Sequence, residues 1–364
     1  MKQLHFSPEP TPFIHELRER IDAYFSEKNI SKYANRRMKL KIALFIGVYI
    51  LSYLLLFTAP NTATLYLLYG FLGAWSVLMG LNIGHDAAHK TIFRRPKSNH
   101  RFLLVFEFLG TNSFNWVNRH LGAHHLFPNV MDYDSDIQQT KVVKIFPKDE
   151  HRTYHALQFI YMPVVYMVYI FRWIVYRDFK DAFSKKIGAF NNAHYPWKEV
   201  VKMILFKLLY LFQMIVLPAY ILDISIWSTF LGFIVLTIIG SLTITLVLLS
   251  THVGEDANFP EPNSNNCLPH SWSYHQIITA ADFSTENRFI NYFFGGFNHH
   301  VMHHLFPNIC HIHYPQLTPI LKELAEKYDL PYRHKKYLFA AVLSHFKLLR
   351  ANSKGSLRIM EENT

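Results

Sequence analysis

Four long apolar segments constrain this chain more than any other feature of its sequence. Of its 364 residues 50% are hydrophobic, and many of them gather in runs separated by polar stretches. Each run approaches the roughly 20 residues that an α-helix needs to cross a bilayer, and a single spanning segment must be helical to satisfy its backbone hydrogen bonds. The sequence therefore predicts an all-α integral membrane protein, with spans at Ile42–Ala59, Thr62–Gly84, Val201–Leu222 and Ile226–Ser250.

The connections and the charges predict how these spans are arranged. Short turns join the first span to the second and the third to the fourth, so we expect two hairpins. The turns near Pro60 and at Asp223–Ser225 lack Lys and Arg, so the positive-inside rule places both termini in the cytosol. The membrane would be the bacterial inner membrane or, in a eukaryote, the endoplasmic reticulum. The basic residues at the other ends of the spans are Arg36, Arg37, Lys39, Lys41, Lys90, Arg94, Arg95 and Lys97.

This placement of charge also bears on partners. The formal net charge of +11 could indicate nucleic-acid binding, but the positive residues follow the span ends, where a membrane protein needs them. We therefore expect a lipid bilayer and no nucleic acid as partner. Lys202 and Lys207, near the start of the third span, are expected to extend toward the interface.

A fifth apolar segment, Leu157–Tyr176, contains Pro163 and Arg172. If it crossed the membrane, the histidines that follow it would face the opposite side from those before it. We therefore interpret this segment as a re-entrant or interfacial helix beside a cytosolic helical cap.

Three regions follow from this reading. Residues 1–39 form a cytosolic or interfacial N-terminal helix, 40–315 the membrane domain, and 316–364 a cytosolic helical tail with a disordered end. Phe13, Leu17 and Ile21 share one face of the first helix. That face packs either on the cytosolic domain or on lipid, and the sequence leaves both open.

Histidine clusters supply the candidate functional residues. Helical positions i, i+3 and i+4 share a face, so the rings within each cluster project together, except that His125 points about 100° away from its pair on an α-helix. Each cluster lies near the end of an apolar segment, so the clusters can meet at one membrane boundary. They are His85/His89, His120/His124/His125 and His300/His303/His304.

The number of imidazoles predicts the kind of site. Zinc takes about four ligands and an octahedral ion about six, so eight histidines suit two ions with open positions. Imidazole binds zinc, copper, iron and nickel alike, so the spacing predicts two metals without identifying them.

A repeated hexapeptide adds candidates for supporting roles. The sequence HHLFPN occurs at His124–Asn129 and again at His303–Asn308. Its proline predicts that each double histidine ends a helix. Asn129 and Asn308 either hydrogen-bond the outer nitrogen of a ligand ring or cap a turn. Further candidates for this supporting role are Asp86 and Asn298.

The clusters resemble the histidine boxes HxxxH, HxxxHH and HxxHH of the membrane fatty acid desaturases, over residues 40–315. The sequence is most similar to bacterial linoleoyl-CoA or acyl-lipid desaturases. The resemblance implies two non-haem irons bound by the eight box histidines and by His252, which follows the last span. It also implies O2-dependent insertion of a C=C bond into an acyl-CoA or acyl-lipid. The acidic loop Asp132–Asp136 resembles a family loop, and His300 stands where front-end members commonly have Gln, so the position of the double bond stays open.

The resemblance also bears on electrons and substrate. Many family members carry a fused cytochrome b5 domain with an HPGG motif, and this sequence lacks that motif. A separate donor of the cytochrome b5 or ferredoxin type is therefore implied. The acyl chain would occupy an apolar tunnel with walls that include Trp75 and Trp116. The residues that would bind either the substrate head group or anionic lipid are Arg94, Arg95, Lys97 and Arg119.

Histidine clusters are also typical of two other functions. A di-iron membrane hydroxylase acting on an alkane, sterol or carotenoid would share the metal site but retain oxygen in its product. A metal or proton transporter would place histidines inside its spans, whereas these clusters lie at or beyond the span ends.

Overall fold

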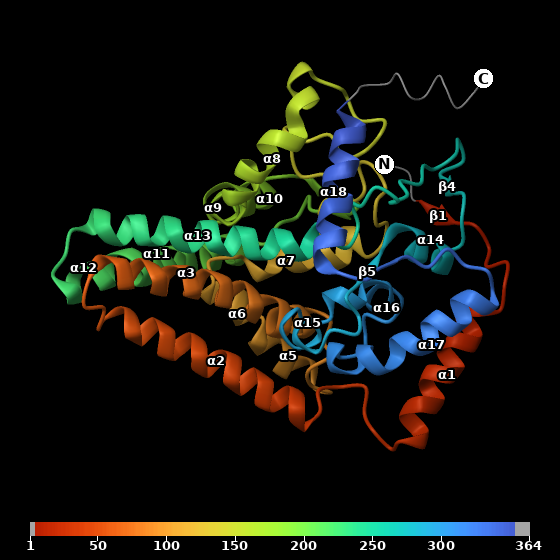
Figure 1. The fold of residues 1–364 in the computed structure, drawn as a ribbon, viewed down its shortest axis with the longest axis horizontal. Coiled ribbons are helices and arrows are strands. Elements are labelled where there is room, and N and C mark those ends of the chain that lie inside the picture. Colours follow the sequence, from red (N-terminus) through yellow and green to blue (C-terminus); the bar gives the residue numbers. More distant parts are fainter. Residues whose placement is uncertain (1–3, 354–364) are drawn as a thin grey trace.

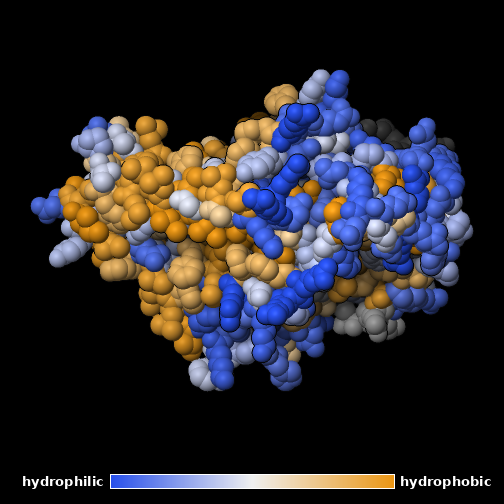
Figure 2. Space-filling model, turned by 90° about the horizontal axis from the view of Figure 1, so that it is seen from below, coloured by the Kyte–Doolittle hydropathy of each residue, from blue (hydrophilic) through white to orange (hydrophobic). Residues whose placement is uncertain are grey.

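The computed structural model describes residues 4–353 and is mostly helical (Figure 1). Within that range, four helices are long and apolar enough to cross a membrane, which confirms the prediction of four candidate spans. They run side by side along one end of the molecule, and Figure 2 shows mainly apolar surface there and hydrophilic surface at the other end. The four are Arg36–Leu56, Thr62–Ala88, Trp197–Leu222 and Ile226–Leu248. The end of the C-terminal tail, which was predicted to be disordered, lies outside the described residues, at 354–364.

Two of these spans contain a π-helical turn. The first span is α2 (Arg36–Leu56) and the fourth is α13 (Ile226–Leu248). The second consists of α3 (Thr62–Met79), η1 (Gly80–Gly84) and α4 (His85–Ala88). The third consists of α11 (Trp197–Leu211), η5 (Phe212–Val216) and α12 (Leu217–Leu222).

The first span begins earlier than expected because an asparagine caps it. The side chain of Asn35 accepts a hydrogen bond of 2.9 Å from the Met38 N–H, which satisfies one of the free donors at the helix start. Asn61 caps α3 in the same way, through the Thr64 N–H at 2.9 Å.

Helices α3 and α13 form the closest pair of the bundle. Gly73 of α3 lies against the backbone of α13, and a Cβ atom there would overlap the Leu236 carbonyl oxygen. Gly240 of α13 faces Gly73 in turn. Small residues at a crossing let two helix backbones approach within a membrane.

The expected re-entrant segment is a bent helix pair. α8 (Gln158–Met167) contains Pro163 and is followed by α9 (Tyr169–Arg172), η4 (Trp173–Arg177) and α10 (Asp178–Ala182). The two halves are bent by 66°. The break is held against the bundle by the Ile170 N–H, which donates to the Ser241 hydroxyl at 2.8 Å.

The remaining elements, outside the four spans and the bent segment, are together called the cap below. The short strands pair as β1–β4 and β5–β6, both parallel, and as β2–β3, antiparallel, so the chain is not purely helical. The helices and turns are α1 (Phe13–Glu27), α5 (Pro96–Phe102), α6 (Leu104–Phe108), α7 (Ser113–Arg119), η2 (His120–His124), η3 (Thr153–Leu157), α14 (Trp272–Thr279), α15 (Arg288–Phe293), η6 (Phe297–His299), α16 (His300–Leu305), η7 (His311–His313), α17 (Tyr314–Lys327) and α18 (Leu338–Asn352). The strands are β1 (His5–Phe6), β2 (Lys186–Ile187), β3 (Phe190–Asn191), β4 (Cys267–Leu268), β5 (Asp282–Phe283) and β6 (His334–Lys335).

The apolar face of α1 packs on protein. Phe13, Leu17 and Ile21 are at most 1% exposed and share a core with residues of α16 and α17. Of the two alternatives left open for this helix, packing on the cap is therefore the one adopted.

Lys207 does not extend toward the interface, so that prediction was wrong. Its side chain is buried, and its Nζ lies 2.8 Å from Asp178 Oδ2 and 2.9 Å from the Gly110 carbonyl oxygen. A buried ammonium needs an opposite charge and hydrogen-bond acceptors, and α10 supplies the charge. Lys202 likewise pairs with Glu107 at 3.0 Å.

Replacing Gly73 with Ala should destabilise the protein by about 1–3 kcal/mol, since the added methyl group overpacks the α3–α13 crossing. Gly47→Ala in α2 is the matched control, because no atom lies within 4 Å of a Cβ there. That change should be neutral or stabilising, since alanine favours helix over glycine. Thermal unfolding in detergent measures both, and equal effects would contradict the close crossing.

Candidate metal centre

A π-helical turn sets the direction of the second histidine box. In η2 the His125 N–H donates to the His120 carbonyl oxygen at 2.9 Å, a bond five residues long. Residues five apart therefore lie on one face, and the Nε2 atoms of His120 and His125 approach to 3.1 Å. The expected divergence of about 100° assumed α-helical geometry and was wrong. Single π turns occur often at functional sites.

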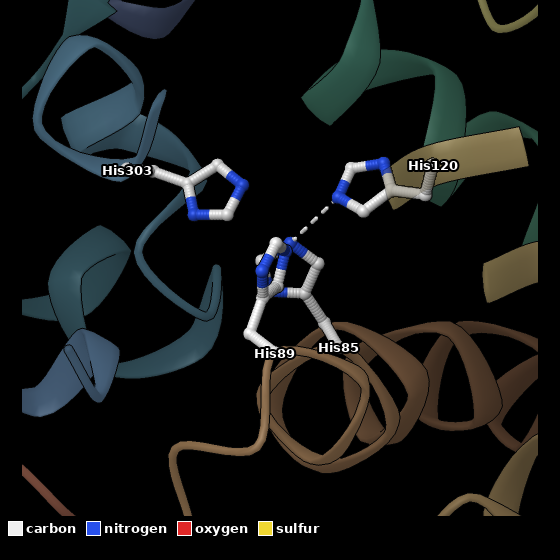
Figure 3. A group of neighbouring side chains, drawn as sticks. All are labelled: His85, His89, His120 and His303. Atoms are coloured by element: carbon white, nitrogen blue, oxygen red, sulfur yellow. Dashed lines mark hydrogen bonds between the residues drawn. The ribbon is translucent and has the colours of Figure 1, made fainter. Parts of the chain in front are cut away.

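The first group of rings contains His85, His89, His120 and His303. Each offers a ligand atom within 4.8 Å of those of the others. Figure 3 shows the rings converging, His85 and His89 from one helix, His120 and His303 from opposite sides. The Nε2 atoms of His85 and His120 are 3.2 Å apart.

The second group contains His124, His252, His300 and His304. His252 Nε2 lies 2.7 Å from His300 Nε2 and 3.0 Å from His304 Nε2. His125 stands between the groups, its ring 4.6 Å from that of His303 and 4.5 Å from that of His304, centroid to centroid. The structure thus brings all nine predicted histidines together, in two groups with one ring between.

Outer hydrogen bonds orient several rings. His124 Nδ1 lies 2.9 Å from Asp134 Oδ2, and His304 Nδ1 lies 2.9 Å from Gln276 Oε1. His252 Nδ1 lies 2.7 Å from the Thr279 carbonyl oxygen. Each acceptor fixes the proton on Nδ1 and leaves the Nε2 lone pair facing inward, the arrangement common around metal-bound histidine.

The donor set fits metal ions. His89 Nε2 and His303 Nε2 are buried without a hydrogen-bond partner. Unsatisfied buried polar atoms cost free energy, and a cation in each group would satisfy the inward lone pairs. Eight imidazoles in two groups of four match the ligand number of two metals with open positions.

Protonation favours the same role. Burial lowers the pKa of His252 to about 3 and that of His304 well below its usual value. Both rings are therefore neutral, as metal ligands must be. At His124 burial acts in the same direction, but the adjacent Asp134 carboxylate outweighs it and raises the pKa.

Comparison with known proteins gives the chain its family. The model of the fatty acid desaturase family matches residues 61–336. The sn-1 linoleoyl-lipid 6-desaturase of Synechocystis is 31% identical, over 93% of this chain and 95% of that protein. An acyl-lipid (8-3)-desaturase of Physcomitrium patens is 30% identical, over 92% of this chain and 70% of that protein. This chain belongs to the fatty acid desaturase family. It is an enzyme, a membrane oxidoreductase that desaturates fatty acyl chains.

The residues predicted to support the metal ligands of this desaturase differ in what they contact. Asp86 accepts from His311 Nδ1 at 2.8 Å and from the Cys310 thiol at 3.0 Å, while its carboxylate stays 3.9 Å from His85 Nδ1. Asn129 donates to the backbone carbonyl oxygens of His252 and Asn258, at 3.0 Å each, so it supports a ligand through the main chain.

The other two asparagines do not contact the rings of the two groups. Asn298 Nδ2 donates to Asn291 Oδ1 at 2.5 Å. The same Asn291 oxygen lies 3.0 Å from His299 Nε2. Asn308 is exposed on the surface. The repeated hexapeptide therefore places its two asparagines in different surroundings.

Arg119 is not available to a head group, because it is 2% exposed and bound on several sides. It pairs with Asp181 at 3.0 Å and with Asp136 at 3.1 Å. Arg94 and Arg95, on the loop after the first box, are exposed, and so is Lys97 in α5.

An apolar cavity of this desaturase reaches both histidine groups. From Gly73 to His85 its wall follows α3, η1 and α4, a helical rise of about 18 Å, and α13 forms the facing wall from Gly240 onward. His85, His120, His124, His252 and His300 all line it. Trp116 lines the cavity as expected. Trp75 packs elsewhere, with its ring stacked 5.5 Å from that of Phe71.

Sequence reasoning missed several supports of this site. Gln276 and the Thr279 carbonyl group come from α14, a helix that none of the sequence patterns described above predicts. Asp282 accepts from the Val301 N–H at 2.8 Å and so fixes the start of α16. Only Asp134 carried a signal, through the acidic loop after the second box.

Asp134→Asn should lower metal affinity about 10- to 100-fold, the usual effect of losing a partner behind a ligand. The change removes the charge beside His124 and keeps the side-chain size. Competition with a chelator measures bound metal per protein. Asp132→Asn, at an exposed position in the same loop, should leave affinity unchanged, and a similar loss there would argue against a specific role for Asp134.

Proposed function

We propose that this desaturase binds two iron ions through the nine histidines and uses O2 to insert a double bond into the acyl chain of a membrane lipid. The observation that carries this proposal is the pair of histidine groups opening onto one long apolar cavity. When bound, the irons supply the activation of O2 that an unreactive methylene group requires.

The residues of this chain hold and shield the substrate. The cavity walls along α3 and α13 are mostly apolar, so they take the acyl chain out of water and hold it straight beside the rings. Fixing a flexible chain beside the metals accelerates the reaction by positioning. The Asp134 and Gln276 contacts keep the ligand rings in place during turnover.

The relatives guide the choice of substrate. Their names describe acyl-lipid and linoleoyl-lipid desaturases, and two of them act at position 6 by name. We propose an acyl-lipid substrate over acyl-CoA, with the new double bond toward the carboxyl end.

The electron balance requires a partner. Reduction of O2 to two waters takes four electrons, and removal of two hydrogen atoms from the acyl chain supplies two. A separate cytochrome b5 or ferredoxin type protein would supply the other two.

For the membrane, we propose that the four spans form two hairpins with the cap, both termini and the metal centre in the cytosol. The basic residues around Lys90 to Lys97 support this orientation. The matched relatives are desaturases, so neither the hydroxylase nor the transporter alternative is favoured.

His304→Ala should abolish the new fatty acid product in an expressing host while the protein still inserts into the membrane. The change removes a buried ligand from the second group. Gas chromatography with mass spectrometry of host lipids measures the product, where a loss of two mass units marks desaturation. His194→Ala, at an exposed position, is the control, and normal product from His304→Ala would refute the ligand role.

Orientation is open to a separate check. Cysteines introduced by Asn61→Cys and Ser225→Cys should react with a membrane-impermeant thiol reagent added outside intact cells. Lys90→Cys should react only after the cells are opened. Labelling of Lys90→Cys from outside would reverse the proposed topology, and Cys267→Ser and Cys310→Ser remove the native thiols beforehand.

A further inference from the structure

A tyrosine hydroxyl in the cavity has a proton without an acceptor. Tyr169 of α9 and Gln139 of the preceding loop both line the cavity and are half-buried, in contrast to the fully buried end formed by Gly73, Tyr210 and Gly240. Two polar side chains therefore lie next to each other in a mostly apolar cavity wall.

Gln139 is locked by its own contacts. Its Nε2 donates to the Asp136 carbonyl oxygen at 2.6 Å and to the Tyr169 hydroxyl oxygen at 3.2 Å. Its Oε1 accepts from Arg177 at 2.8 Å. Both amide protons and the amide oxygen are thus engaged, so the side chain is held as a fixed donor to Tyr169.

This contact decides what Tyr169 offers. Because the hydroxyl oxygen accepts from Gln139, the hydroxyl proton must find another acceptor. No residue between 4 and 353 accepts it, and the side chain borders the cavity. A donor left unsatisfied in an apolar cavity costs free energy, which an acceptor on a bound substrate would recover.

We infer that the Tyr169 hydroxyl donates a hydrogen bond to the carbonyl oxygen of the substrate's acyl ester. This inference rests on the proposed function and deepens it. An acyl chain is apolar along its length, and its carbonyl oxygen is the strong acceptor that it carries into the cavity. Tyr169 is then a positioning residue that fixes the first carbon of the chain.

The position of this hydroxyl has a consequence for the product. Asp136, which accepts from Gln139 through its backbone, also lies 3.3 Å from His120 Nδ1 through its carboxylate. Two hydrogen-bonded residues, Gln139 and Asp136, thus separate the Tyr169 hydroxyl from a ring of the first histidine group. The carbons near the carboxyl end would lie beside the metals, with the methyl end in the deep part along α3 and α13.

Tyr169→Phe tests the inference, since it removes the hydroxyl and keeps the ring. With purified holoenzyme, a reductant and phospholipid vesicles carrying ester-linked linoleoyl chains, we expect KM to rise about tenfold. We also expect more than one double-bond position, located chemically in the product. Tyr176→Phe, on the same segment and 51% exposed, should match the unaltered enzyme. A single product and unchanged KM in Tyr169→Phe would overturn the inference.

A substrate without the carbonyl group separates this role from a structural one. Vesicles carrying ether-linked linoleyl chains should be desaturated poorly by the unaltered enzyme. Tyr169→Phe should lose that discrimination and treat ester and ether chains alike. Persistent discrimination in the variant would overturn the inference, as would its absence in the unaltered enzyme.

The failure of the proposed function gives a different result. An unaltered enzyme with two bound irons that desaturates neither lipid removes the proposed function and this inference with it. An unaltered enzyme that desaturates the ester lipid by a Tyr169-independent route keeps the function and removes the inference alone.

Discussion

The metal centre depends on imidazoles whose outer nitrogens are held by fixed acceptors. Three acceptors each fix one Nδ1 atom: Asp134, Gln276 and the Thr279 carbonyl group. The Nε2 atoms of these rings therefore face inward, where they can bind a cation. These acceptors come from the loop after η2 and from α14. The packing of the cap therefore determines the direction of the ligand rings.

Much of this arrangement follows from sequence. Apolar run length predicts the four candidate spans, and the number of imidazoles predicts two metal ions. The helical spacing did not predict that the second and third boxes would each be divided between the two groups. The π turn at His120–His124 escaped prediction because it depends on one extra residue per turn, which no residue type marks. The role of Gln276 was not predicted because it depends on a tertiary contact with a distant segment. The residues around Gln276 do not indicate a helix that faces the rings.

The ion pairs of buried charged residues were also not predicted from the sequence. Arg119 and Lys207 look like interfacial residues in sequence, since both follow or enter apolar segments. In the fold each meets carboxylates of α10, at Asp181 and at Asp178. The bent segment α8–α10 thereby joins the second histidine box to the third span through ion pairs. A hydropathy profile scores each residue without regard to distant residues, so it does not predict these ion pairs.

The close contact between α3 and α13 has an effect on how the enzyme family can vary. Gly73 and Gly240 face each other at this crossing, and both line the cavity. Larger side chains there would push the helices apart, and smaller ones do not exist. Adaptation to longer or shorter hydrocarbon tails would therefore have to proceed through other lining residues, such as Tyr210 of α11.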